Sequence, residues 1–94
     1  MNIKDNHSNK PVSAYPLFKG KGSHATAIEL KPGGQLKEHI TKTEALLICV
    51  EGSVRFANEH GTVVDLKSGD YIVIEPMVIH WLEGLEMSQL ILIK

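Results

Sequence analysis

The sequence predicts an all-β fold in a single domain, and three observations support this prediction. After residue 22 the chain is a series of short apolar or β-branched segments, which at close and regular spacing are typical of strands. Clusters of Gly, Pro, Asn and Asp separate these segments, as expected for turns. No segment with a helical period is long enough to compete with the strand pattern. A chain of 94 residues has room for one hydrophobic core.

The first predicted strand is 24–30, because Thr26, Ile28 and Leu30 alternate with the residues between them. Pro32 and the glycines after it end this strand, since Pro removes a backbone donor and Gly accepts a positive φ. The turn at 58–61 predicts a hairpin with Gly61 as its left-handed residue. Further turns are predicted at 67–70 and at Gly84. The remaining strands are predicted over 43–50, 53–58, 62–66, 71–75, 79–82 and 87–93.

Three of these strands are apolar on both faces, over 46–50, 71–74 and 90–93. A strand with water on one side should alternate, so the second face of these strands needs a cover. We expect that cover to be a partner subunit in a homodimer. The alternative is that the N-terminal segment, with Tyr15, Leu17 and Phe18, folds over the outer surface of its own chain. Residues 1–23 are accordingly predicted to be an arm or edge segment.

Composition excludes several classes of protein. Ten basic and eleven acidic residues give a net charge of -1, so the positive field of a nucleic-acid-binding protein is absent. The longest apolar run, 45–50, is far below the roughly 18 to 20 residues that span a bilayer. Residues 1–16 lack the apolar stretch of a secretory signal. A single cysteine, Cys49, agrees with a reducing compartment. We therefore expect a cytoplasmic protein that binds neither nucleic acid nor membranes.

Two segments of the chain resemble the two motifs of the small single-domain cupins. The first motif has the form G-x5-H-x-H-x3,4-E-x6-G, and the second G-x5-P-x-G-x2-H-x3-N. The positions that match are Gly33, His39 and Gly52 in the first motif and Gly69 and His80 in the second. The positions that depart from the motifs are Thr41 for His, Ala45 for Glu, Glu75 for Pro, Met77 for Gly and Gly84 for Asn. The resemblance implies a jelly-roll β-barrel, also called a double-stranded β-helix, over residues 24–94.

The same resemblance implies a metal site with half of its ligands missing. His39 and His80 remain, and Thr41 and Ala45 occupy two ligand positions. Catalytic zinc and non-haem iron sites normally use three protein ligands, so two imidazoles alone hold a divalent metal weakly. Glu44 is the obvious candidate for a third ligand, but period 2 turns it outward if Ala45 points inward. We expect at most a weakly bound divalent metal ion at His39 and His80.

Three hypotheses of function follow, and the sequence leaves open whether the protein is an enzyme. The first is a module that binds a small molecule in the barrel mouth, because Thr41 and Ala45 in place of His and Glu leave the pocket larger and less charged. The second is a metal-dependent enzyme of the dioxygenase or isomerase type that uses His39 and His80. The third is a structural dimer with a vestigial site. The ligand pocket of the first hypothesis is expected to contain His39, Thr41, Ala45, Leu47, Cys49 and His80.

Overall fold

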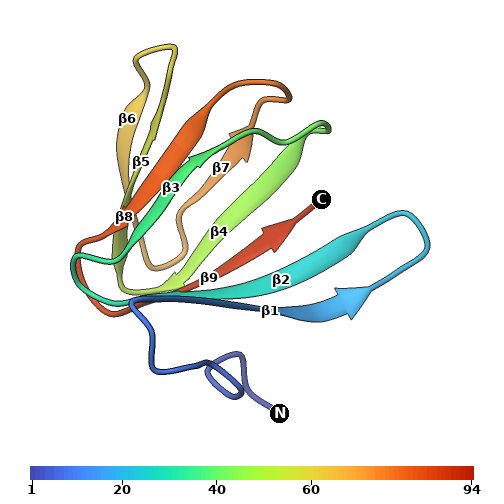
Figure 1. The fold of residues 1–94 in the computed structure, drawn as a ribbon, viewed down its shortest axis with the longest axis vertical. Helices are drawn as coiled ribbons and strands as arrows, with labels where there is room; N and C mark the ends of the chain where they lie inside the picture. The colour runs from blue at the N-terminus through green and yellow to red at the C-terminus, as the bar shows by residue number, and fades with distance from the viewer.

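The computed structural model describes residues 1–94 and contains nine β-strands. Their bounds are β1 (Val12–Lys19), β2 (His24–Leu30), β3 (Gln35–His39), β4 (Ala45–Glu51), β5 (Ser53–Asn58), β6 (Val63–Lys67), β7 (Tyr71–Ile74), β8 (His80–Gly84) and β9 (Ser88–Ile93). The strands form a five-stranded sheet, β1-β2-β9-β4-β7, and a four-stranded sheet, β3-β8-β5-β6, and every pairing is antiparallel. The two sheets face each other in a flattened barrel of jelly-roll type (Figure 1). The predicted all-β fold is confirmed.

The hydrophobic core lies between the two sheets and follows from the alternation of each strand. Every second residue of a strand points to the same face, so Leu47 of β4 and Leu90 of β9 meet Val54 and Phe56 of β5 across the barrel. Eleven buried apolar residues form this one cluster. The core therefore fills the middle of the barrel with side chains and leaves its two ends to be closed by loops.

The strand predictions are confirmed for seven of the nine strands, with shifts of up to two residues at their ends. Strands β2 and β5 have the predicted bounds. Two strands were missed because their patterns are irregular. Strand β3 carries a single apolar residue, Leu36, between polar ones, and β1 contains Pro16 and forms an edge of its sheet. The predicted turn at Gly84 lies slightly later, since Gly84 is the last residue of β8.

Two β-bulges interrupt the edge strands. In β3, Leu36 pairs with Leu82 and His39 pairs with His80, so one extra residue separates the two pairs on the β3 side. A bulge of this kind changes which face the following side chains occupy. It places both Leu36 and His39 on the inner face although they are three residues apart. In β1 the register shifts between Pro16 and Phe18.

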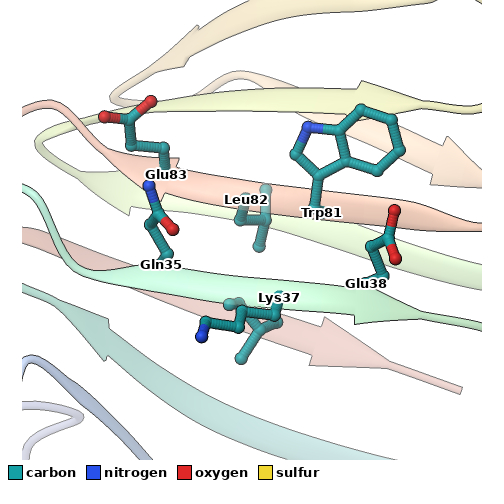
Figure 2. Close-up of a pocket in the computed structure, with 7 residues that line it drawn as sticks. Gln35, Lys37, Glu38, Trp81, Leu82 and Glu83 are labelled. Carbon is teal, nitrogen blue, oxygen red and sulfur yellow. The ribbon is translucent and has the colours of Figure 1, made fainter.

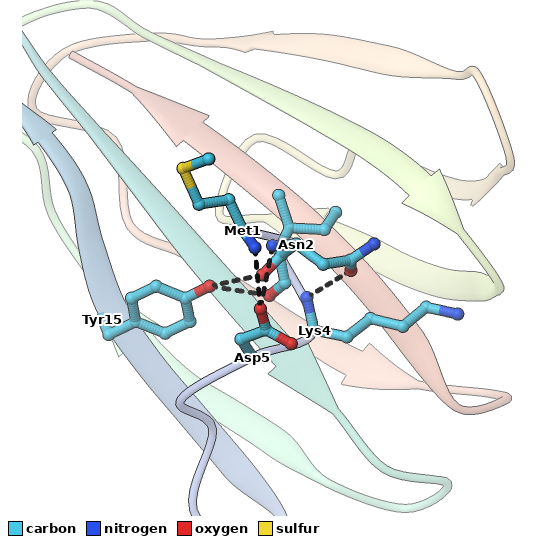
Figure 3. Close-up of polar contacts among 6 residues, drawn as sticks. Met1, Asn2, Lys4, Asp5 and Tyr15 are labelled. Atoms are coloured by element: carbon cyan, nitrogen blue, oxygen red, sulfur yellow. Dashed lines mark hydrogen bonds and ion pairs between the residues drawn. The ribbon is translucent and has the colours of Figure 1, made fainter.

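Residues 1–10, here called the N-terminal strap, lie on the outer face of the five-stranded sheet. The Tyr15 hydroxyl lies 3.0 Å from the backbone oxygen of Ile3, to which it donates a hydrogen bond (Figure 3). Farther across the sheet, Lys4 Nζ lies 2.8 Å from a carboxylate oxygen of Glu51. The predicted covering of the outer surface by the N-terminal segment is therefore observed in part. Leu17 and Phe18, which were expected to take part in it, are exposed on β1. No helix that could span a membrane is present.

Candidate functional site

Both predicted histidines lie at one end of the barrel, here called the barrel mouth. His39 is the last residue of β3 and His80 the first of β8, and the two are direct partners in the sheet. Their ring centroids are 6.2 Å apart, with the ring planes inclined at 41°. The C-terminus and the β3–β4 and β7–β8 loops lie at the same end (Figure 1). The structure thus brings together the two histidines that the sequence motifs place forty-one residues apart.

His80 is a buried, stacked imidazole with only 5% of its surface exposed. Its ring stacks on Phe56 with centroids 5.8 Å apart and planes inclined at 20°. Its Nδ1 lies 3.3 Å from the backbone oxygen of Val78, and because a carbonyl only accepts, this contact assigns the neutral ring's proton to Nδ1. The Nε2 atom is then left as an acceptor.

Burial is the main cause that lowers the pKa of His80 below its ordinary value. The hydrogen bond to Val78 raises the pKa, and the nearby charges of His39 and Lys94 lower it further. Desolvation penalises the charged form of an imidazole, and positive neighbours act in the same direction. The neutral form of His80 is therefore favoured at neutral pH.

This lowered pKa predicts a loss of stability in mild acid. The unfolded chain takes up the His80 proton near pH 6.5, while the folded chain binds it only at lower pH. The free energy of unfolding should therefore fall as the pH drops below about 6.5, down to the folded pKa. Urea unfolding at half-unit steps from pH 8 to pH 5 measures this slope. The His80→Gln variant should lose part of the slope between pH 6.5 and 5.5, whereas His60→Gln, at an exposed position, should keep it. Equal slopes in all three proteins would contradict the assignment.

Thr41 lies in the loop between β3 and β4 that helps to close the barrel mouth. Its side chain is 6% exposed, and its hydroxyl oxygen is buried without a hydrogen-bond partner. A buried hydroxyl nearly always has a hydrogen-bond partner. The Thr41 hydroxyl is therefore free to form a hydrogen bond with a ligand or a water molecule. The Thr41 backbone oxygen accepts a hydrogen bond of 2.8 Å from Met77. Met77 has a φ of +61°, a conformation that favours glycine, at the position where the cupin motif has Gly.

Lys94 is a residue of the barrel mouth that the sequence reasoning missed. It follows β9 directly, exchanges two backbone hydrogen bonds with His24, and is close enough to His80 to lower its pKa. No motif marks this position. Only the pairing register of β9 with β4 locates Lys94. Ile93 pairs with Leu46, and this pairing places Lys94 beside the start of β4. His24 itself is exposed on β2.

The other predicted pocket residues lie along β4 at increasing depth. Ala45 is buried at the mouth end, and Leu47 is fully buried two residues farther in. Cys49 lies about 13 Å along the strand from Ala45, next to the turns at the far end of the barrel. Burial and the charge of Asp70 raise the pKa of its thiol, which keeps it protonated and unreactive. The structure therefore gathers His39, Thr41, Ala45 and His80 at the mouth, and places Leu47 and Cys49 in the core.

The residues present do not fit a metal centre with three protein ligands. No group of three His, Cys, Asp or Glu side chains is arranged to hold a metal ion. Glu44, the candidate third ligand, is exposed just before β4, as its outward orientation predicts. His39 and His80, with ring centroids 6.2 Å apart, are the only ligand residues of the two motifs that lie close together.

Two grooves lie beside strand β3. A shallow groove of about 280 Å³ at the mouth is lined by Glu38, His39, Ile40 and Ile79. A larger groove of about 620 Å³ lies over β3 and β8, where Trp81, Glu83, Gln35 and Glu38 project from the same side of the sheet (Figure 2). Trp81 thus faces away from His80, as the alternation of the strand predicts. The mouth groove is the smaller of the two and the one that includes a predicted site residue.

The comparisons with known proteins agree with this architecture. A family model described as a cupin domain matches residues 27–93. A cupin superfamily protein of Desulfitobacterium hafniense DCB-2 has a TM-score of 0.84 at 16% identity, covering 96% of this chain and 81% of that one. KdgF from Halomonas sp. has a TM-score of 0.85 at 18% identity, covering 99% and 89%. The cupin domain of Schizosaccharomyces pombe Cnp3 has a TM-score of 0.83 at 14% identity, covering 98% and 69%. No curated protein sequence matches the chain.

Proposed function

Because the chain belongs to the cupin family, we propose that it binds a small anionic molecule at its barrel mouth. The observation that carries this proposal is the group of three basic side chains there: His39, His80 and Lys94. Each of them lacks an ion pair with a carboxylate. An anion placed among them would offset the repulsion from His39 and Lys94, which adds to the larger effect of burial in lowering the pKa of His80.

The unpartnered hydroxyl of Thr41 supports the same proposal. A hydroxyl can donate to an anion's oxygen, and donors aimed at an ionised acceptor form the stronger class of hydrogen bond. Of the residues named above, only His39 lines the mouth groove of about 280 Å³, which Glu38 also lines. This volume lies just below the roughly 300 to 1,000 Å³ of typical ligand pockets, so we expect a compact ligand such as a short carboxylate or a phosphate.

Anion binding should strengthen as the pH falls, because the protonated form of His80 is the better partner. Acetate, succinate and inorganic phosphate are suitable probes, titrated at pH 8, 7 and 6 while the histidine ring signals are followed by NMR. Above the pKa of His80, the affinity for a binding anion should rise by up to about tenfold for each unit of pH decrease. Binding at the mouth should move the ring signals of His39 and His80 and leave that of His7 unchanged.

Two variants make this experiment specific. Lys94→Met should weaken the binding of anions, whereas Lys67→Met, at the opposite end of the barrel, should not. Equal affinity for acetate and for neutral acetamide would contradict the proposal, as would an affinity that does not change with pH. Binding that is lost in EDTA and restored by zinc would instead support the metal-dependent alternative at His39 and His80. No binding of any probe would favour a structural protein with a vestigial site.

A further inference from the structure

The larger groove beside β3, here called the outer groove, lies on the outer face of the four-stranded sheet. Its volume of about 620 Å³ is within the roughly 300 to 1,000 Å³ of typical ligand pockets. All seven residues that line it belong to β3 or β8. Only Glu38 also lines the mouth groove. The outer groove is therefore separate from His80 and from the proposed anion site.

Trp81 forms the aromatic wall of the outer groove. It is the only tryptophan of the chain, and it follows His80 directly, so the alternation of β8 turns it to the outer face. Its partner on β5, Ala57, is 6% exposed although it lies on the same face, which indicates that the indole covers it. The groove lies on the other side of the indole, towards β3. There Trp81 offers a π face to a cation and an apolar surface to methylene groups.

Two carboxylates lie at the two ends of the outer groove. Glu83 lies beside Gln35 at one end, and Glu38 lies beside Trp81 at the other (Figure 2). The bulge in β3 produces this arrangement, because it sets Lys37 and Glu38 opposite the single residue Trp81. No ion pair of the structure includes Glu38 or Glu83.

The cationic side chains nearby leave these carboxylates without a partner. Arg55 pairs with Glu83 in the sheet register, but its guanidinium donates to Asp65, with Nε and Nη2 at 2.8 Å and 3.2 Å from the two carboxylate oxygens. Lys37 also lines the groove, and its side chain runs away from Trp81 (Figure 2). The two glutamates at the ends of the groove therefore complement a cationic ligand.

We propose that the outer groove binds a linear aliphatic polyamine. Glu38 lies one strand across from Glu83 and two to three residues along, so their backbone positions are roughly 8 to 11 Å apart. A chain with an ammonium group at each end spans this separation and places one charged donor at each carboxylate. Its methylene groups then pack on Trp81. No group of three His, Cys, Asp or Glu side chains is arranged to hold a metal ion, so the complementary occupant is an organic cation.

The fluorescence of Trp81 tests this proposal directly, because no other tryptophan contributes to the emission. Spermidine, titrated at low ionic strength and neutral pH, should change this emission along a saturable curve. Butylamine, which has a single ammonium group, should bind about fivefold more weakly, the effect of one exposed ion pair. Uncharged 1,8-octanediol should give no saturable change. Added sodium chloride should weaken the binding of spermidine, because it screens exposed charges.

Variants locate the site. Glu38→Gln and Glu83→Gln should each weaken the binding of spermidine by about fivefold. The matched control is Glu44→Gln, an exposed carboxylate outside the groove, which should bind as the wild type does. Trp81→Leu should also bind more weakly, as measured by the NMR shifts of the amide signals of β3 and β8. Lys94→Met should bind spermidine unchanged, so this test does not depend on the anion site at the barrel mouth.

Four outcomes would overturn the proposal. The first is the absence of any response to spermidine up to a concentration on the order of 10 mM. The second is equal binding of spermidine and octanediol, which would assign the response to apolar packing alone. The third is unchanged affinity in both Glu38→Gln and Glu83→Gln. The fourth is an equal loss in Glu44→Gln, which would assign the effect to the overall charge of the protein. Both groove glutamates are partly or fully exposed, so we expect their variants to fold, which circular dichroism checks.

Discussion

Replacing Phe56 by alanine should lower the free energy of unfolding by about 3 to 5 kcal/mol. Phe56 is 2% exposed, is among the largest fully buried side chains, and lies in the core cluster while its ring stacks on His80. Its removal leaves a cavity that the surrounding strands cannot fill by small shifts. For a domain whose total stability is about 5 to 15 kcal/mol, this is a large fraction. Urea unfolding followed by circular dichroism measures the loss.

The same variant should raise the pKa of His80 toward its ordinary value. Burial is the largest cause of the lowered pKa, and removal of the stacked ring lets water reach the imidazole. An NMR titration of the folded variant measures this shift. Phe56→Leu is the matched control, because it keeps most of the volume and should cost less than about 1.5 kcal/mol. A Phe56→Ala variant as stable as Phe56→Leu would show that the ring is not part of the core.

Replacing Gly52 by alanine should cost at least about 3 kcal/mol, for two reasons that add. Gly52 has a φ of +96°, where a side chain costs about 1 to 3 kcal/mol. A Cβ at this position would also meet the backbone oxygen of Met87 and the buried hydroxyl of Ser88. Ser88 is fully buried and accepts a hydrogen bond of 2.9 Å from the backbone of Ser53, so it cannot move away without breaking this contact.

Gly69→Ala separates the two contributions. Gly69 has a φ of +92°, but a Cβ there would meet no atom within 4 Å. This variant should therefore show the conformational cost alone, about 1 to 3 kcal/mol. The difference between the midpoints of unfolding of the two variants measures the cost of the close contact at Gly52. Equal losses in the two variants would contradict the packing described around Ser88.

The fold could be predicted from the sequence where a strand alternates between regular turns. Strands β2 and β5 have regular alternation, and their bounds are as predicted. Strand β3 was missed because its pattern is polar and because a bulge breaks its period of two. Strand β1 was missed because Pro16 is unusual in a strand, and only its position at the edge of the sheet makes it acceptable.

The candidate site was predictable only at the positions that match the cupin motifs. The resemblance to the cupin motifs implies that His39 and His80 converge, and the structure pairs them directly. The depth of Cys49 was misjudged because alternation gives the face of a residue but not its distance from the barrel end. No sequence pattern marks Lys94, because its position at the mouth depends on how β9 pairs with β4.

The bulges in β3 and β1 have a consequence for how the protein behaves at high concentration. Both strands lie at open edges of their sheets, where unpaired backbone groups could recruit a strand from another molecule. The extra residue in β3 and the missing amide hydrogen of Pro16 interrupt these edges. An incoming strand can therefore form only a short run of hydrogen bonds along β1 or β3, which disfavours the growth of fibrils from these two edges.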